Sequence, residues 1–255
     1  MEKSPGGKSG RKKTRTGVPS YLYVKELGRT VKFDVGRMER RGFPEVVLAT
    51  GKSDEDISQV ISRIPAEGHP VVISRLDDKR FEEIVAPVLR RRGLAVARRV
   101  GMVFISPPGW KKQDNSDTGK VAIVTAGSSD IHVAAETAAL LDFLGYSYKE
   151  FYDCGIAGMH RTIKASEEVL KGGYTVAIVF AGMEGALASV FASLVPIPVI
   201  GVPTSTGYGF GGAGEAALGS MLQSCVPGLL TVNIDNSVGA AAAAISILRS
   251  SRRHE

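Results

Sequence analysis

The chain of 255 residues is long enough for one large or two modest domains, and its 44% hydrophobic and 23% charged residues are ordinary for a globular protein. No apolar run reaches the roughly 18–20 uncharged residues of a membrane span, so we expect no transmembrane helix. Two cysteines and four scattered histidines exclude a disulfide framework and a Cys-based zinc site.

The net charge of +6 is concentrated at the N-terminus. Residues 1–20 hold six Lys or Arg and one acid, whereas residues 21–255 hold 26 basic and 25 acidic side chains. We therefore predict that residues 1–20 form a disordered basic tail. The near-neutral remainder does not favour a nucleic-acid partner. Because the first residues lack the apolar core of a secretory signal, we expect a cytoplasmic location.

Residues 21–115 are predicted to form a small N-terminal α/β domain. Ser53, followed by three acids, predicts the start of a helix, because such a residue caps the helix and acids suit its first turn. The other expected elements are a helix-like segment at 21–27, strands at 43–50 and 69–76, a helix that ends at Gly93, and one or two strands within 94–106. The polar Pro/Gly-rich residues 107–119 then mark the domain boundary.

Residues 119–250 are predicted to form a second domain in which strands and helices alternate strictly. Expected strands lie at 121–127, 146–155, 174–182, 198–205 and 227–236. Expected helices lie between and after them, at 128–145, 158–173, 183–195 and 237–249, with a Gly-rich loop at 207–225. The 128–145 helix is expected to be capped by Ser128 or Ser129. This alternation predicts an α/β fold with a doubly wound parallel sheet, covered by helices on both faces.

Five short loops of small or polar residues follow the predicted strands of the second domain: TAGSSD, DCGIAGMHR, AGMEG, PTSTGYGFGG and NIDN. The carboxyl ends of parallel strands meet at one edge of a sheet, so these loops predict an active site there. Taken singly, a glycine after a strand is more typical of a tight turn. Neither GxGxxG nor a P-loop occurs, and we expect no tightly bound organic cofactor.

The same segments resemble a known family. VAIVTAGSSDIHVAAETAALLDFLG, GMHRTIKASEE, VAIVFAGMEGALASV, PVIGVPTSTGYG and MLQSCVPGLLTVNIDN resemble PurE-type aminoimidazole ribonucleotide (AIR) carboxylases and, more closely, the LarB family. FDVGRMERRGFPEVVLATGKS also resembles LarB and has no counterpart in PurE. The resemblance covers about residues 30–248. It departs from PurE at Gly127 and Gly158, where PurE has serines, and at MEGAL, which replaces a His; Ala188 replaces a Pro of LarB.

This resemblance implies an enzyme that carboxylates the pyridinium ring of nicotinic acid adenine dinucleotide with CO2 and hydrolyses its phosphoanhydride. The products would be pyridinium-3,5-biscarboxylic acid mononucleotide, a precursor of the nickel-pincer cofactor, and AMP. The alternative within enzymes is an AIR carboxylase or N5-carboxyaminoimidazole ribonucleotide mutase of purine biosynthesis. A non-catalytic nucleotide-binding regulator is a further alternative. The relationship to PurE also implies a homo-oligomer, an octamer.

Three residues are implied to be catalytic. Cys225 in SCVPG would add to the ring as a thiolate, because this group is both a good nucleophile and a good leaving group. Glu184 would activate water at the phosphoanhydride or hold Mg²⁺ there. Asp235 would orient the Cys225 loop or act as a base. The structural alternatives are a buried inert cysteine and a helix cap. Cys154 is expected to be a buried cysteine without a catalytic role.

The resemblance also implies a set of substrate-binding residues. They are Ser128, Ser129, Asp130, His160, Arg161, Gly182, Met183, Arg37 and Arg41. Asp130 is expected to contact a ribose or a group next to a phosphate. His160 and Arg161 are expected to clamp a phosphate or carboxylate. For each of them, and for the Arg side chains of RMERRG, a capping role or a solvated helix surface is the alternative.

Overall fold

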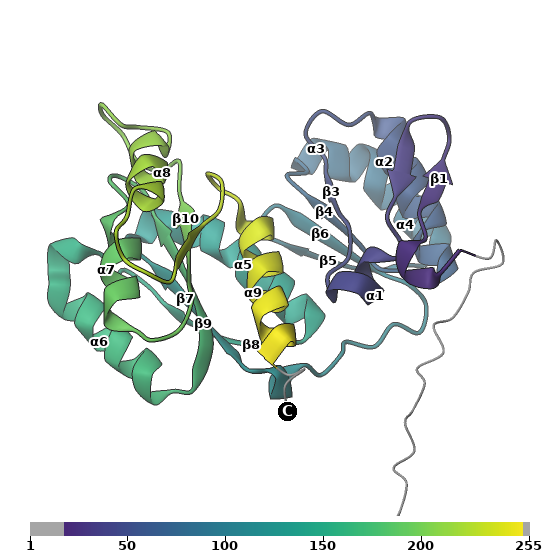
Figure 1. Cartoon of the computed structure of the whole chain (residues 1–255). Helices are drawn as coiled ribbons and strands as arrows, with labels where there is room; N and C mark the ends of the chain where they lie inside the picture. The colour runs from purple at the N-terminus through teal and green to yellow at the C-terminus, as the bar shows by residue number, and fades with distance from the viewer. Residues whose placement is uncertain (1–17, 252–255) are drawn as a thin grey trace, which may run out of the picture.

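The computed structural model describes residues 18–251, in two lobes that each contain a β-sheet (Figure 1). Of the tail predicted at residues 1–20, residues 1–17 lie outside the described part of the chain. Among the described residues, no helix combines the length and the apolar composition needed to cross a membrane.

The N-terminal lobe contains a four-stranded mixed sheet and a short antiparallel hairpin. The sheet has the order β3-β4-β6-β5, and only β3 and β4 run parallel. Its strands are β3 (Val46–Leu48), β4 (Val71–Ser74), β5 (Ala95–Arg99) and β6 (Met102–Ser106), and the hairpin is β1 (Lys25–Leu27) with β2 (Val31–Phe33). The helices are α1 (Arg37–Arg41), α2 (Asp54–Arg63), α3 (Asp78–Arg80) and α4 (Ala86–Arg92).

The N-terminal lobe confirms two predicted helix ends and corrects one element. The Ser53 side chain accepts the N–H of Asp56 and caps α2, and Gly93 ends α4 with a φ of 62°. The helix-like segment expected at 21–27 is wrong: a 3-10 turn is followed by β1, whose pairing with β2 supplies the hydrogen bonds. Between α3 and α4 the helix widens to a π-turn at Phe81–Val85, next to Pro87, which cannot donate a helical hydrogen bond.

The C-terminal lobe confirms the predicted fold class. Its five strands all run parallel in the order β11-β10-β9-β7-β8. They are β7 (Lys120–Thr125), β8 (Ser147–Phe151), β9 (Tyr174–Ala181), β10 (Val199–Pro203) and β11 (Leu229–Thr231). The helices are α5 (Ile131–Leu144), α6 (Met159–Lys171), α7 (Ala186–Leu194), α8 (Glu215–Leu222) and α9 (Ser237–Ser251). The Gly-rich loop expected at 207–225 therefore contains a helix, α8.

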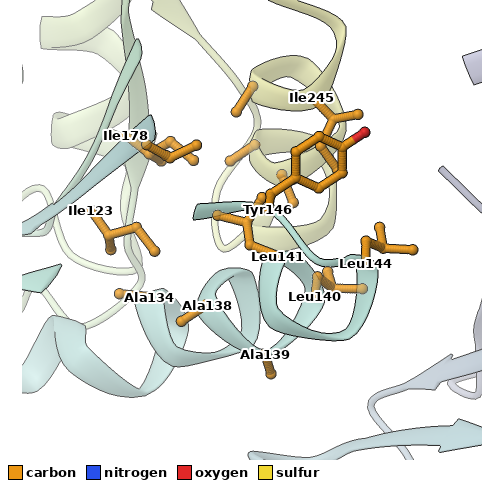
Figure 2. Close-up of a cluster of buried hydrophobic side chains, with 14 of the residues drawn as sticks. Ile123, Ala134, Ala138, Ala139, Leu140, Leu141, Leu144, Tyr146, Ile178 and Ile245 are labelled. Carbon is orange, nitrogen blue, oxygen red and sulfur yellow. The ribbon is translucent and has the colours of Figure 1, made fainter. Parts of the chain in front are cut away.

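Alternate residues of each buried strand point to opposite faces of this sheet. In β7, Val121 and Ile123 pack with α5 and α9, whereas Ala122 and Val124 pack with α6, α7 and α8. This arrangement explains the continuous apolar runs of the sequence, because both faces of each central strand are covered. Figure 2 shows the first of these cores, in which Ile123, Ile178 and Ile245 gather beside α5.

The two lobes share a hydrophobic core. Val72, Met102 and Phe104 of the N-terminal sheet belong to the same buried cluster as the side chains of α5 and α9. The ring centroids of Phe104 and Phe143 lie 4.9 Å apart. The face of α5 that turns away from its own sheet is thus covered by the N-terminal sheet, which holds the two lobes together through apolar burial.

Candidate active site

A pocket of about 270 Å³ opens at the carboxyl edge of the parallel sheet. It lies between the loops after β7 and β9, where the direction of chain winding reverses, which is the usual ligand site of this fold. Of the substrate-binding and catalytic residues predicted from the sequence, it brings together Ser129, Asp130, Gly182, Met183 and Glu184. We call it the active-site pocket.

Asp130 fastens the loops around the active-site pocket and is only 2% exposed. Its Oδ2 accepts the N–H of Gly127 at 2.8 Å, and its Oδ1 accepts the hydroxyls of Thr204 at 2.5 Å and Thr206 at 2.8 Å. The first bond closes the loop after β7, and the two threonine bonds join it to the loop after β10. Because a carboxylate accepts about four hydrogen bonds, Asp130 keeps little capacity for a ligand and acts mainly as a support.

The serines beside Asp130 do not cap the following helix as predicted. Asp130 accepts the Gly127 N–H itself, a 3-10 turn occupies Ser128–Asp130, and α5 begins only at Ile131. Both serines are exposed, and within residues 18–251 neither hydroxyl has a hydrogen-bond partner. Their hydroxyls are therefore available to a ligand, and Ser129 lines the pocket.

The turn after β9 presents Glu184 to the active-site pocket. A Cβ on Gly182 would lie 2.5 Å from the hydroxyl oxygen of Thr206, so only glycine fits there. Met183 and Gly185 both have positive φ, of 48° and 69°. This tight backbone leaves Met183 and Glu184 exposed at the pocket, with α7 beginning directly after them. Glu184 is the exposed carboxylate of the pocket lining.

His160 and Arg161 begin α6 and are not among the residues that line the active-site pocket. Arg161 instead forms an ion pair with Asp153, a residue held at a φ of 54°. The side chain of His160 is exposed. Within one chain, His160 and Arg161, the residues expected to bind a phosphate or carboxylate, are therefore outside the pocket lining. Arg161 already has a carboxylate partner.

Cys225 is exposed but lies away from the active-site pocket. It lines a separate open groove with Ala192 and Ser193, near the end of α7, and with Pro198, just before β10. The active-site pocket reaches the other end of α7. A nine-residue helix is about 13 Å long, so Cys225 and Glu184 are separated by roughly the length of α7 within one chain.

Within one chain, Asp235 lies far from the Cys225 loop that it was predicted to orient, and its other predicted role, as a base, stays a prediction. Asp235 follows the carboxyl end of β11, whereas Cys225 precedes the amino end of the same strand. The Asp235 Oδ1 accepts the N–H of Ser205 at 2.9 Å, so the carboxylate supports the loop after β10. Its distance from Cys225 follows from the direction of β11, which separates the two loops at opposite edges of the sheet.

Arg37 and Arg41 line a third cavity, of about 580 Å³, between α1 and α9. Arg37 Nε lies 3.2 Å from Asp34 Oδ2, and Arg40 binds the same oxygen at 2.6 Å. Arg41 has no ion pair in the part of the chain that the structure describes. These guanidinium groups are therefore separate from the active-site pocket.

Sequence reasoning missed three charged residues near the sites. His132 and Glu136 lie on successive turns of α5, and the Nδ1 of His132 is 2.7 Å from the Ser129 carbonyl oxygen. Burial raises the pKa of Glu136 above its ordinary value. Arg75 approaches from the N-terminal lobe. The spacing of a His and a Glu four residues apart, directly after SSD, was the one available signal.

No group of three or more His, Cys, Asp or Glu side chains that could hold a metal ion occurs among the described residues. At the active-site pocket, Glu184 is exposed while the oxygens of Asp130 are already engaged. This donor set fits a Mg²⁺ ion only if substrate phosphates supply further oxygens, which is how proteins usually bind Mg²⁺.

Comparison with known proteins matches a family to each of the two lobes. The C-terminal part, residues 120–254, matches the AIR carboxylase family, and residues 24–100 match the LarB/PurE-like N-terminal domain. An uncharacterized protein of Methanocaldococcus jannaschii is 39% identical over 220 residues, which are 86% of this chain and 84% of that protein.

Two enzymes are similar to about half of this chain. The N5-carboxyaminoimidazole ribonucleotide mutase of Pyrococcus horikoshii is 33% identical over 52% of this chain and 74% of its own length. The enzyme with the same name from Methanocaldococcus jannaschii is 33% identical over 50% of this chain and 78% of its own length. These matches indicate an enzyme of the carboxylase or mutase type. The chain therefore belongs to the AIR carboxylase family, as a LarB-type member that carries a LarB/PurE-like N-terminal domain.

Proposed function

We propose that the protein carboxylates the pyridinium ring of nicotinic acid adenine dinucleotide with CO2 and hydrolyses the phosphoanhydride to release AMP. The observation that carries this proposal is an exposed cysteine, Cys225, in a chain that joins the AIR carboxylase fold to a LarB-type N-terminal domain. A pyridinium ring is electron-poor and does not attack CO2, so the proposed reaction needs a nucleophile that activates the ring.

In the proposed first step, the Cys225 thiolate adds to the pyridinium ring. The electron pair of the new C–S bond neutralises the ring and makes carbon 5 nucleophilic, as in an enamine. Carbon 5 then attacks CO2 and forms a C–C bond. Loss of the ring proton from carbon 5 and expulsion of the thiolate restore the aromatic pyridinium, so the net change is replacement of a C–H by a carboxylate and release of one proton.

In the proposed second step, Glu184 takes a proton from a water molecule that attacks the phosphoanhydride. The exposed position of Glu184 on a rigid turn of the active-site pocket suits a general base. Mg²⁺ bound there would neutralise charge on the phosphates. In the alternative role of Glu184, this carboxylate and substrate oxygens would hold the ion, in place of Glu184 acting as the base. The exposed hydroxyls of Ser128 and Ser129 would contact the phosphates.

We further propose that the working enzyme is a homo-oligomer, an octamer as the PurE resemblance implies. The support is geometric, because Cys225 and Glu184 lie at opposite ends of α7 within one chain. A second copy could bring its Cys225 groove to the active-site pocket of the first. Exposed apolar side chains near these regions, including Tyr208, Phe210 and Leu222, suit burial against another subunit.

The decisive experiment incubates the protein with nicotinic acid adenine dinucleotide and bicarbonate and measures both AMP and the mass of the pyridinium product. We expect AMP release together with a product heavier by one CO2. A parallel incubation with aminoimidazole ribonucleotide tests the alternative, an AIR carboxylase or mutase. Turnover of that nucleotide, without AMP release from the dinucleotide, would contradict the proposed function.

A further inference from the structure

A cleft of about 320 Å³ lies between the two lobes and is separate from the active-site pocket. Leu48 and Arg75, at the ends of β3 and β4, form its N-terminal side, and Glu136 of α5 with residues 233–238 forms its other side. We call it the interlobe cleft. Its volume falls at the lower end of the roughly 300–1,000 Å³ found for small-molecule sites.

Arg75 brings an available positive charge to the interlobe cleft. It is exposed, and its Nη2 donates a long hydrogen bond of 3.3 Å to the backbone oxygen of Asp235. Within residues 18–251, no carboxylate lies within ion-pair distance of it. Because a guanidinium carries five N–H donors, most of them remain free for an anionic ligand such as a phosphate.

Glu136 supplies a half-buried acceptor on the opposite wall. Its Oε2 accepts the hydroxyl of Ser237, which leaves Oε1 without a hydrogen-bond partner among the described residues. Burial raises the pKa of this carboxyl, mainly because desolvation disfavours the charged form. The cleft thus has a cationic wall and a hydrogen-bond acceptor, with the apolar side chains of Leu48, Ile234 and Val238 between them.

Arg75 and Asp235 contact each other across the interlobe cleft. Arg75 and Asp235 both have left-handed backbone conformations, with φ of 55° and 52°, and they are hydrogen-bonded to each other. Such conformations cost free energy for residues other than glycine, and they occur preferentially at binding and catalytic sites. Two of them meeting across one cleft indicate a constrained geometry rather than a loose contact.

The interlobe cleft and the active-site pocket are neighbours. Asp235, in the wall of the cleft, accepts the N–H of Ser205, and the next residue, Thr206, lines the pocket. Ser129, in the 3-10 turn before α5, lines the pocket, and Glu136 of α5 lines the cleft, with His132 about one turn from each. Glu136 lies seven positions after Ser129, which corresponds to about 10 Å along a helix, a separation that one extended ligand can bridge.

We propose that the interlobe cleft binds the nucleoside monophosphate half of a dinucleotide whose other half occupies the active-site pocket. This inference rests on the proposed function for the identity of the dinucleotide. Arg75 binds a phosphate, and His132, whose Nδ1 donates to the Ser129 carbonyl oxygen, lies at the bridge between the two sites. Glu136 accepts a ribose hydroxyl, and the base packs against Leu48 and Ile234.

The experiment measures binding without turnover, by calorimetry on the full chain with AMP and nicotinic acid mononucleotide as separate probes. We expect each probe to bind in the presence of the other, because they occupy different sites. Arg75→Ala should weaken AMP binding about tenfold or more, the usual effect of losing a charged hydrogen bond. It should leave the affinity for the mononucleotide unchanged. Leu48→Trp, at an exposed position, should block AMP by filling the cleft.

Arg92→Ala is the matched control, since Arg92 is exposed at the end of α4 and lines none of the four cavities described above. It should bind AMP as the wild type does. Circular dichroism shows whether each variant is folded. Absence of AMP binding, competition between the two probes, or normal AMP binding by both cleft variants would overturn the inference. None of these outcomes depends on carboxylation, so the proposed function stands or falls separately by its own assay.

Discussion

The two thiols of the protein have opposite environments. Cys154 is buried at the end of β8, its thiol donates to the Tyr152 carbonyl oxygen at 3.4 Å, and burial raises its pKa. Cys225 is exposed in an open groove. Because the thiolate is the reactive form and must reach the substrate, only Cys225 suits nucleophilic chemistry.

Replacement of Cys225 by serine is expected to abolish ring carboxylation, because a hydroxyl is a much poorer nucleophile and leaving group at neutral pH. Mass spectrometry of the pyridinium product is the measurement. Cys154→Ser is the matched control and should carboxylate at close to the wild-type rate, since the new hydroxyl can donate to the same Tyr152 oxygen. Near-normal carboxylation by folded Cys225→Ser would rule out the thiolate mechanism.

Replacement of Glu184 by glutamine should separate the two proposed steps. Glutamine keeps the size of the side chain but cannot take a proton from water. Loss of a general base typically costs about 10²–10⁴-fold in rate. We therefore expect a carboxylated dinucleotide that retains its AMP half to accumulate, visible by mass spectrometry. AMP release at the wild-type rate would show that Glu184 only shapes the turn.

At the scale of elements, the connection between the lobes is fastened to α5. The carboxylate of Asp142 accepts a hydrogen bond from Lys112 Nζ at 2.7 Å and forms an ion pair with Arg99 of β5. Trp110 stacks on Phe143, with ring centroids 6.0 Å apart. Asn115 donates to the Leu144 carbonyl oxygen at 2.7 Å. The polar segment between the sheets is thus held along one helix rather than left as a free linker.

Asp142→Asn tests the ionic part of this attachment. The hydrogen bond from Lys112 holds the pKa of Asp142 below its ordinary value, with a further contribution from Arg99. A lowered carboxyl pKa stabilises the fold above the unfolded value near 3.8, and this contribution is lost as the pH falls through the folded pKa. At pH 7 we expect the variant to lose about 0.5–1 kcal/mol of unfolding free energy, measured with urea.

The difference between Asp142→Asn and the wild type should shrink as the pH is lowered toward 3.8 and below. Glu167→Gln is the control, because its pair with Lys171 is 3.8 Å long and exposed, and it should change stability very little. A loss that stays constant with pH would assign the effect of Asp142 to packing instead of charge.

At the scale of the whole molecule, the separation of Cys225 from Glu184 leads to a test of shared active sites. A mixture of Cys225→Ser and Glu184→Gln subunits contains pairs in which one chain supplies the cysteine and the other the glutamate. If the site is built across subunits, subunit exchange should restore formation of the biscarboxylated mononucleotide. Each variant alone should form almost none.

The control for this mixing experiment keeps the two variants on opposite sides of a dialysis membrane. A released intermediate can cross the membrane, whereas subunits cannot. Restored activity only after subunit exchange supports the shared site. Equal activity in both arrangements would mean that the two steps occur in separate subunits through a diffusing intermediate, which would contradict the shared site.

Local patterns in the sequence were sufficient for much of the fold. The apolar runs and alternating elements of residues 119–250 predicted the parallel sheet, and Ser53 and Gly93 marked helix ends correctly. These features depend on hydrogen bonds and burial within short windows of chain. The errors, at residues 21–27 and in the Gly-rich segment that contains α8, arose where pairing or packing with distant residues overrode the local pattern.

In the candidate site, too, some features could be predicted from the sequence and others could not. Because parallel strands end at one edge, the sequence alone was enough to place the loops with Asp130 and Glu184 together, and the active-site pocket contains both. Only the tertiary structure placed Cys225 at the far end of α7 and brought Arg75 to Asp235 across the lobes. The reason is physical: strand direction and turns are local properties, whereas the distance between two loops depends on the order of strands and on how two sheets pack against α5 and α9.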